Sequence, residues 1–266
     1  MGSCAAQRLA ACGSMVGGRW VLMALQKVGG QYIGAMFRQL LSGLSRHIPS
    51  QCAVCHAWPA RPVCDNCVQR FGQPVARCRS CALPVPSGTL RCGACVRQPP
   101  PVDQALAAVA YDYPWAGLMA QFKFQEQTGW ARSLALLMRS APWVEPALED
   151  ADWLLPMPLS AQRLQTRGFN QTLVLARALE PDKLRANVLL RVKETPPQSS
   201  LSRQQRRLAV RGAYAVEPVH AEAVRGKRIV LLDDVMTTGA TLHEAAQLLR
   251  RQGAAHITAL VFARTE

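Results

Sequence analysis

The sequence predicts an α/β domain built on a mainly parallel sheet, preceded by a small cysteine-rich module. From residue 103 to the C-terminus, apolar strand patterns alternate with helical patterns, which is typical of parallel strands joined by crossover helices. Eight of the ten cysteines lie between Cys52 and Cys95, in four CxxC pairs. The proline-rich segment QPPPVD at 98–103 is a linker that marks the boundary between the two parts.

Length and charge limit the possible functions. A chain of 266 residues, 49% of them hydrophobic, is long enough for two globular domains. The formal net charge of +14 favours polyanionic partners such as nucleic acid, phosphorylated small molecules or acidic lipid. Ordinary surface charge is the alternative. The run from Met15 to Phe37 is interrupted by polar and charged residues, and no signal peptide is convincing. We therefore expect a cytoplasmic chain without stable membrane insertion.

Residues 1–49 are expected to form an N-terminal extension with one amphipathic helix. The segment 30–48 has helical periodicity, with Ile33, Phe37 and Leu44 on its apolar face. This face is expected to pack on the cysteine module, and a membrane or a partner surface is the alternative.

The cysteine module, residues 50–97, has the ligand spacing of a double zinc ribbon. Tetrahedral Zn²⁺ takes four thiolates, and each CxxC turn supplies two of them. In a cytoplasmic protein such pairs indicate metal rather than disulfides. Two closed sites leave no position for water, so both zinc ions are expected to be structural. Sequential pairing is favoured over an interleaved arrangement. The predicted ligands are Cys52, Cys55, Cys64, Cys67, Cys78, Cys81, Cys92 and Cys95.

The α/β part, residues 103–266, is expected to contain four strands and four helices. The strand expected at 227–235 is an apolar run of the kind that is buried on both faces of a parallel sheet. The helix expected at 240–254 is amphipathic. In chain order we expect a strand at 105–113, helices at 115–124 and 129–141, a strand at 152–159, a helix at 169–180, a strand at 227–235, a helix at 240–254 and a strand at 256–265.

The segment RIVLLDDVMTTGATL at 228–242 predicts a binding site. Its strand is expected to end at Leu232, and ligands bind beyond the carboxyl ends of parallel strands. TTGAT then opens a helix whose N–H groups can hold phosphate, with a glycine for close approach. Asp233 and Asp234 suit vicinal hydroxyls, or a Mg²⁺ on a second phosphate. A ligand with a phosphate at one end and a diol near its middle is a ribose 5-phosphate. A Walker B strand is the rival, but the chain has no GxxxxGK[ST] loop.

This segment closely resembles the signature of the type I phosphoribosyltransferases, which is an apolar run, two acids, two spacers and T-G-x-T. The resemblance implies a type I phosphoribosyltransferase-like sheet and a magnesium-dependent site for phosphoribosyl pyrophosphate. It makes Asp233 and Asp234 the catalytic acids, which hold the ribose hydroxyls. It assigns the 5-phosphate to Thr237, Thr238, Gly239, Ala240 and Thr241, and it counts the spacers Val235 and Met236 among the ligand-binding residues.

Two further segments, PMPLSAQRLQTRGFNQ at 156–171 and QSSLSRQQRR at 198–207, look like parts of the ComF family. That family has a zinc module ahead of a phosphoribosyltransferase-like domain, and it includes bacterial competence proteins needed for natural transformation. The resemblance extends roughly from Cys52 to the C-terminus. It implies a role in DNA uptake, with single-stranded DNA and other uptake proteins as candidate partners.

The residues of these segments fit a pyrophosphate site. Leu159 and Ser160 are expected to end a strand at the ligand edge of the sheet. Arg163 and Arg167 are four apart and therefore share one face of a helix, and the arginine fork suits phosphate oxygens. The start of 200–212 has turn-forming residues and no apolar period, so we interpret it as a mobile lid carrying Arg203, Arg206 and Arg207. A solvated charged face is the alternative.

Three functions remain open at this stage. The first is an enzyme that transfers phosphoribose to an unidentified acceptor. The second is an accessory factor of the competence machinery that binds single-stranded DNA without transferase activity. The aromatic stretch at 111–124 suits stacked bases, although we expect most of its rings in the core and Lys123 as the best contact. The third is a structural zinc adaptor, which would leave Asp233 and Asp234 without a function.

Overall fold

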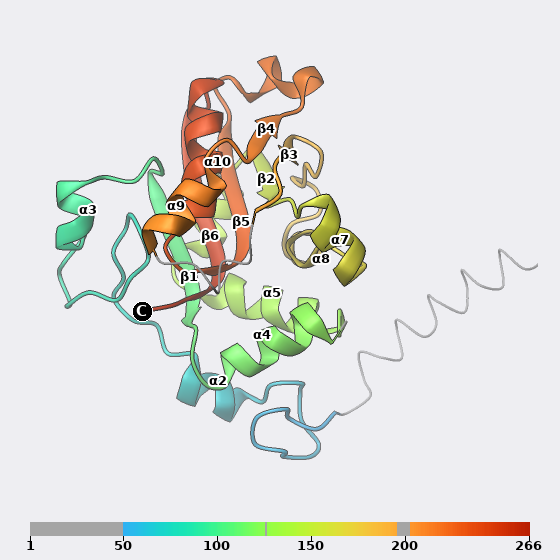
Figure 1. The fold of residues 1–266 in the computed structure, drawn as a ribbon. Coiled ribbons are helices and arrows are strands. Elements are labelled where there is room, and N and C mark those ends of the chain that lie inside the picture. The colour runs from blue at the N-terminus through green and yellow to red at the C-terminus, as the bar shows by residue number, and fades with distance from the viewer. Residues whose placement is uncertain (1–49, 126, 196–202) are drawn as a thin grey trace, which may run out of the picture. The chain divides into compact units, whose positions relative to one another are not determined.

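The computed structural model describes residues 50–125, 127–195 and 203–266. The predicted helix at 30–48 and the start of the predicted lid lie outside the described residues. Residues Gln51–Glu266 form one compact unit, and Figure 1 shows its strands and helices. Among the described residues, none of the helices combines the length and the apolar character needed to cross a bilayer.

The centre of the unit is a four-stranded sheet in the order β1-β6-β5-β2. All three strand pairs are parallel, which confirms the predicted sheet. The two interior strands are the longest, and they are buried on both faces, as their apolar sequences require. The strands are β1 (Gln104–Ala110), β2 (Trp153–Pro156), β5 (Arg228–Met236) and β6 (His256–Arg264).

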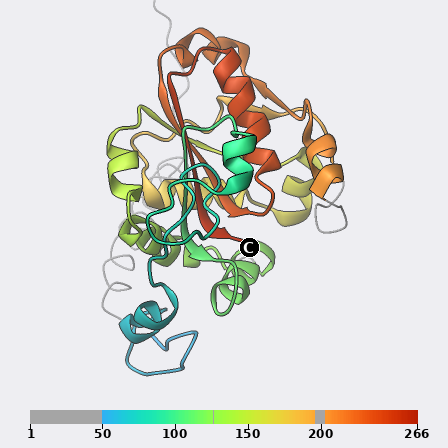
Figure 2. The same ribbon diagram turned by 90° about the vertical axis from the view of Figure 1, so that its left-hand side faces the viewer.

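Helices cover both faces of this sheet. Successive side chains of a strand point to opposite faces, and from Ile229 to Leu232 of β5 both sets are apolar. Val230 and Leu232 of β5 pack into one apolar cluster, and Ile229 and Leu231 pack into another. The first cluster includes α4 (Trp115–Phe124), α5 (Trp130–Ser140) and α8 (Gln171–Leu179). The second includes α10 (Ala240–Arg251) and the antiparallel pair β3 (Leu189–Arg191) and β4 (Tyr214–Val216). In Figures 1 and 2, α10 lies against the central strands.

The remaining described elements are short. The sequence analysis predicted neither the β3–β4 pair nor α6, because such short segments carry no clear period. The predicted lid is helical over α9. These elements are α2 (Asp65–Phe71), α3 (Gly93–Arg97), α6 (Val144–Glu149), α7 (Ala161–Arg167), α9 (Arg203–Val210) and the 3₁₀ turns Pro218–His220 and Glu222–Val224.

Two predicted strand ends were wrong. The strand pattern at 227–235 agrees with β5, but the end expected at Leu232, before the acids, was wrong: the strand continues through both acids to Met236, because β6 continues to pair with it. The strand expected to reach Leu159 ends instead at Pro156, where two prolines remove backbone donors. Leu159 and Ser160 therefore lie in the loop before α7, and Ser160 caps that helix.

Candidate functional site

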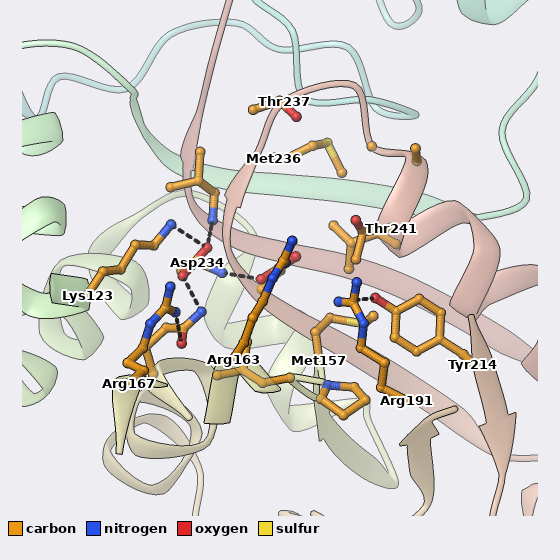
Figure 3. A pocket seen from close by; sticks show the side chains of 18 of the residues that line it. Lys123, Met157, Arg163, Arg167, Arg191, Tyr214, Asp234, Met236, Thr237 and Thr241 are labelled. Atoms are coloured by element: carbon orange, nitrogen blue, oxygen red, sulfur yellow. Dashed lines mark hydrogen bonds and ion pairs between the residues drawn. The ribbon is translucent and has the colours of Figure 1, made fainter. Parts of the chain in front are cut away.

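A cavity of about 480 Å³ opens where β5 ends, at the carboxyl edge of the sheet. Its walls come from that edge, the start of α10, the helices α4, α7 and α8, and the β3–β4 pair. Figure 3 shows basic side chains on one side and the threonines of the β5–α10 loop on the other. The size suits a small-molecule ligand, and the place is the one that parallel sheets provide for ligands.

The second acid, Asp234, lies inside the protein and is fully engaged. Only 4% of it is exposed. Lys123 Nζ is 2.9 Å from its Oδ1, and Gln171 Nε2 donates to its Oδ2 at 2.8 Å. The backbone N–H of Val235 also donates to Oδ1, at 2.6 Å. A buried carboxylate needs such partners, so Asp234 joins α4 and α8 to the end of β5.

The first acid, Asp233, is only half-buried and faces the opposite side of the sheet, toward Arg191 and Tyr214. Burial and the neighbouring charge of Asp234 raise its pKa to about 7. The backbone N–H of Asp234, which donates to its Oδ1 at 2.9 Å, opposes this rise, as does the charge of Lys123. The carboxylate of Asp234 is paired with Lys123 inside the protein. Asp233 is therefore the carboxylate that is placed to meet a ligand.

The loop after β5 has the geometry of an anion site. Gly239 adopts φ 76°, a left-handed conformation that favours glycine. A Cβ at this position would come within 2.9 Å of the His243 ring. The helix α10 starts at the next residue, so its first N–H groups and the positive end of its dipole face the cavity. The sequence-predicted residues of this segment that line the cavity are Val235, Met236, Thr237, Gly239, Ala240 and Thr241.

One loop residue lies elsewhere. The cavity wall does not include Thr238. Its Oγ1 accepts a hydrogen bond of 3.3 Å from the N–H of Ala240, and it faces a second cavity behind the loop. Thr238 therefore shapes the helix start and does not point at the ligand space.

Three arginines gather opposite the loop. Arg163 and Arg167 reach the cavity from α7, as their spacing predicted. Arg191 joins them from β3, and its Nη1 donates to the Tyr214 hydroxyl at 3.3 Å. Burial lowers the pKa of Arg163, and the charges of Arg191 and Arg167 lower it further. Guanidinium groups crowded in this way favour an anion between them.

Other predicted residues stand apart from this group. Leu159 lines the cavity, whereas the wall does not include the buried Ser160. The hydroxyl of Ser160 instead contacts Glu194 and the N–H of Arg163. The side chains of the predicted lid residues Arg203, Arg206 and Arg207 lie outside what the structure describes.

Sequence reasoning missed three polar residues of the site. They are Gln171, Arg191 and Tyr214, which all line the cavity. Burial raises the pKa of Tyr214 to about 12, so it is a neutral donor. Gln171 stands in the quoted FNQ segment, which was a usable signal. The other two stand on short strands without a motif.

The eight cysteines form two groups of four, each with all sulfur atoms within 4.8 Å of one another. Distances of 3.8 Å for Cys52–Cys67, 3.6 Å for Cys55–Cys64 and 3.7 Å for Cys81–Cys92 join sulfur atoms. A tetrahedron with Zn–S bonds of about 2.3 Å places its sulfur atoms about 3.8 Å apart, whereas a disulfide requires about 2.05 Å. The thiols therefore fit two zinc ions, and the sequential pairing is confirmed.

The two groups of four cysteines share one local hydrogen-bond pattern. The N–H of Cys64 donates to Cys52 Sγ at 3.4 Å, and the N–H of Cys92 donates to Cys78 Sγ at 3.3 Å. Burial acts to raise the pKa of these two acceptor thiols, but backbone N–H bonds outweigh it and lower the values to about 6 for Cys52 and about 7 for Cys78. Such thiolates are ready to bind metal.

Comparison with known proteins agrees with this geometry. The family model for the phosphoribosyl transferase domain matches residues 174–266, which include both acids and the loop. The DNA utilization protein YhgH of Salmonella typhimurium is 31% identical over 227 residues, which cover 82% of this chain and 98% of that protein. Competence protein F of Haemophilus influenzae is 32% identical over 211 residues, covering 76% and 90% of the two chains. The chain belongs to the ComF family.

A third ComF relative matches over a shorter stretch. Competence protein ComFC of Bacillus subtilis is 37% identical over 102 residues, which cover 38% of this chain and 40% of that one. The ComF resemblance and the fold class predicted from sequence are thus confirmed, with two Cys₄ groups ahead of a phosphoribosyltransferase-like domain.

One expectation about this ComF chain was wrong. Most rings of the aromatic stretch were expected in the core, but only two of the five, Trp115 and Phe122, are buried. Tyr111 is 36% exposed, Tyr113 is 69% exposed and Phe124 is 71% exposed. Phe124 lines the cavity, and the guanidinium carbon of Arg167 lies 5.2 Å from the centre of its ring. Lys123, expected to be a nucleic-acid contact, pairs instead with Asp234.

Proposed function

We propose that the cavity binds phosphoribosyl pyrophosphate together with Mg²⁺, and that the chain is a phosphoribosyltransferase-type protein acting in DNA uptake or use. The names of its relatives, which refer to DNA utilization and competence, support the cellular role. The acceptor of the phosphoribosyl group is unidentified.

The observation that carries this proposal is that one cavity is lined by a helix start, by arginines and by a half-buried carboxylate. The start of α10 offers backbone N–H groups to the 5-phosphate. Arg163 and Arg191 line the same cavity and suit the pyrophosphate. Asp233 lines this cavity as well and would accept hydrogen bonds from ribose hydroxyls. A ligand with phosphates at both ends and a diol between them suits these three kinds of group.

The donor set also fits Mg²⁺. This ion prefers carboxylate oxygens and phosphate oxygens, and it keeps several waters. Asp233 supplies the carboxylate, and the ligand would supply the phosphate oxygens. Mg²⁺ would neutralise negative charge between the Asp233 carboxylate and the phosphate oxygens. It would also favour the ionised form of Asp233, whose pKa is raised by burial.

The chain's own residues would then act on the transfer as follows. The arginines hold the pyrophosphate as it gains negative charge on leaving. The carboxylate of Asp233 stabilises positive charge that develops on the ribose. Asp234, through Lys123 and Gln171, keeps the end of β5 fixed against α4 and α8. Asp233 is thus the residue in contact with substrate, and Asp234 is a positioning residue.

The test is calorimetric titration of phosphoribosyl pyrophosphate with Mg²⁺ into the parent chain and into Asp233→Asn and Arg191→Ala. We expect each variant to bind about tenfold or more weakly, because each removes a charge-assisted contact. Arg185→Ala is the matched control, since that arginine is outside the wall of the cavity. Equal affinity of the parent and Asp233→Asn would refute the ribose contact.

A second candidate function is binding of single-stranded DNA, and the exposed rings of Tyr113 and Phe124 favour it. Bases stack on such rings beside cationic side chains, and Arg167 lies against Phe124. Contacts with roughly four phosphates predict a log–log salt slope of about −3. Anisotropy of a labelled oligonucleotide across a salt series measures this slope. We expect Phe124→Ala to weaken binding, and no binding at low salt would remove this candidate.

A further inference from the structure

Arg264, the last residue of β6, is a buried cation to which the proposed function gives no role. Only 3% of it is exposed, at the end of an otherwise largely apolar strand. Burying a guanidinium is costly unless its N–H groups are satisfied. Its Nε donates to the carbonyl of Cys81 at 2.8 Å, and its Nη1 donates to the carbonyl of Met236 at 3.0 Å and also to that of Thr237.

These carbonyls belong to two different sites. Cys81 is a ligand of the second Cys₄ group, whereas Met236 and Thr237 begin the loop that faces the ligand cavity. In a trans peptide the N–H points away from the C=O. By holding the carbonyls of Met236 and Thr237 from behind, Arg264 turns the N–H groups of Thr237 and Thr238 away from itself. Thr237, whose carbonyl is held in this way, lines the ligand cavity.

Charge links the same two sites. Four thiolates around one Zn²⁺ leave a net negative charge, and the Arg264 cation hydrogen bonds to the carbonyl of one of these ligands. A cavity of about 320 Å³ is lined jointly by Arg264, by ligands of this group such as Cys92, and by Thr238 from the back of the loop. Zinc in the second site therefore favours the position of the guanidinium that holds the loop.

The first Cys₄ group has different neighbours. Its members Cys52 and Cys67 pack into the apolar cluster that contains α4. The Nε1–H of Trp115 donates to the carbonyl of Phe71, at the end of α2, at 2.9 Å. The two groups thus provide an internal comparison within one chain.

We propose that Arg264 is a positioning residue that couples the second zinc site to the anion-binding loop. Zinc in that site holds the loop N–H groups in the binding arrangement, and loss of that zinc releases them. The coupling concerns the same loop as the proposed function and rests on that function only for the identity of the anion.

The first test compares Cys92→Ser with Cys64→Ser. The two cysteines hold equivalent places, because each is half-buried and each is the N-cap of the short helix in its module. Hydrogen exchange is measured on the amides of residues 237–241, with those of residues 229–232 in β5 as a check on the fold. We expect exchange at 237–241 to be about tenfold faster in Cys92→Ser and within about twofold of the parent in Cys64→Ser. Equal effects of the two changes would overturn the coupling.

The second test uses Arg264→Lys, which keeps the charge but loses the fork. Zinc release from the second site to a chelator is followed in the Cys64→Ser background. We expect release to be about tenfold faster after Arg264→Lys, because the donors of an ammonium group all lie on one nitrogen, whereas the arginine uses Nε for the Cys81 carbonyl and Nη1 for the two loop carbonyls. Release from the first site, followed in the Cys92→Ser background, should not change. Unchanged release from the second site would overturn the proposal.

Reciprocity separates this inference from the proposed function. If loop and zinc are coupled, zinc in the second site and inorganic phosphate bound at the loop must strengthen each other's equilibrium binding by the same factor. Phosphate that binds without raising the zinc affinity of the second site would refute the coupling. If inorganic phosphate and phosphoribosyl pyrophosphate both fail to bind the parent chain, the proposed function fails, and the exchange comparison of the two serine variants still decides the coupling.

Discussion

Replacing Asp233 by Asn should change how stability depends on pH. Burial and the charge of Asp234 raise the pKa of Asp233 to about 7, from an ordinary value of 3.8. The native state therefore holds this proton more tightly than the unfolded state. By linkage, the free energy of unfolding should fall as pH rises from about 4 to about 7, and it should level off above that.

The magnitude follows from the shift. Each pKa unit corresponds to about 1.4 kcal/mol, and water near a half-buried group together with proton sharing by the acid pair reduces the full effect. We expect Asp233→Asn to be more stable than the parent by about 1 to 2 kcal/mol at pH 8, and equally stable near pH 4. Urea unfolding at pH 4, 6 and 8 measures both. Parallel pH curves for the parent and the variant would refute the burial argument for Asp233.

Three further predictions concern other parts of the molecule. Lys123→Met should lower the free energy of unfolding by about 3 kcal/mol at pH 8, because it leaves the buried Asp234 carboxylate without its cation; a loss below about 1 kcal/mol in urea titration would contradict this. Gly239→Ala should weaken phosphoribosyl pyrophosphate binding about tenfold in calorimetry, through strain at φ 76° and contact with His243 at the loop that holds the 5-phosphate. Gly168→Ala is its control, because Gly168 has the same φ of 76° but a Cβ added there would meet no atom within 4 Å. Metal analysis of freshly reduced protein should give about two Zn²⁺ per chain, and one or none would contradict the two-site account.

The sequence predicted those parts of the site whose chemistry is written in consecutive residues. The acids, the glycine and the threonines of the β5–α10 segment carry local signals for a strand end, a tight turn and a helix start. The CxxC pairs carry the same kind of signal for zinc. The structure places most of these residues as expected, because each depends mainly on its own segment.

The rest of the site depends on contacts between distant segments. Nothing near Asp234 in the chain shows that Lys123 and Gln171 would occupy its carboxylate. Nothing local shows that Arg191, on a strand of three residues, would complete the arginine group. The exposed side of α4 was equally hidden, since Phe122 and Phe124 look alike in sequence and differ only in what packs against them.

The most direct test of the central claim is a crystal structure of the chain with phosphoribosyl pyrophosphate and Mg²⁺. The account predicts the 5-phosphate on the N–H groups at the start of α10, the ribose hydroxyls on Asp233 and the pyrophosphate beside Arg163 and Arg191. A ligand bound elsewhere, or an empty cavity at millimolar ligand, would contradict it.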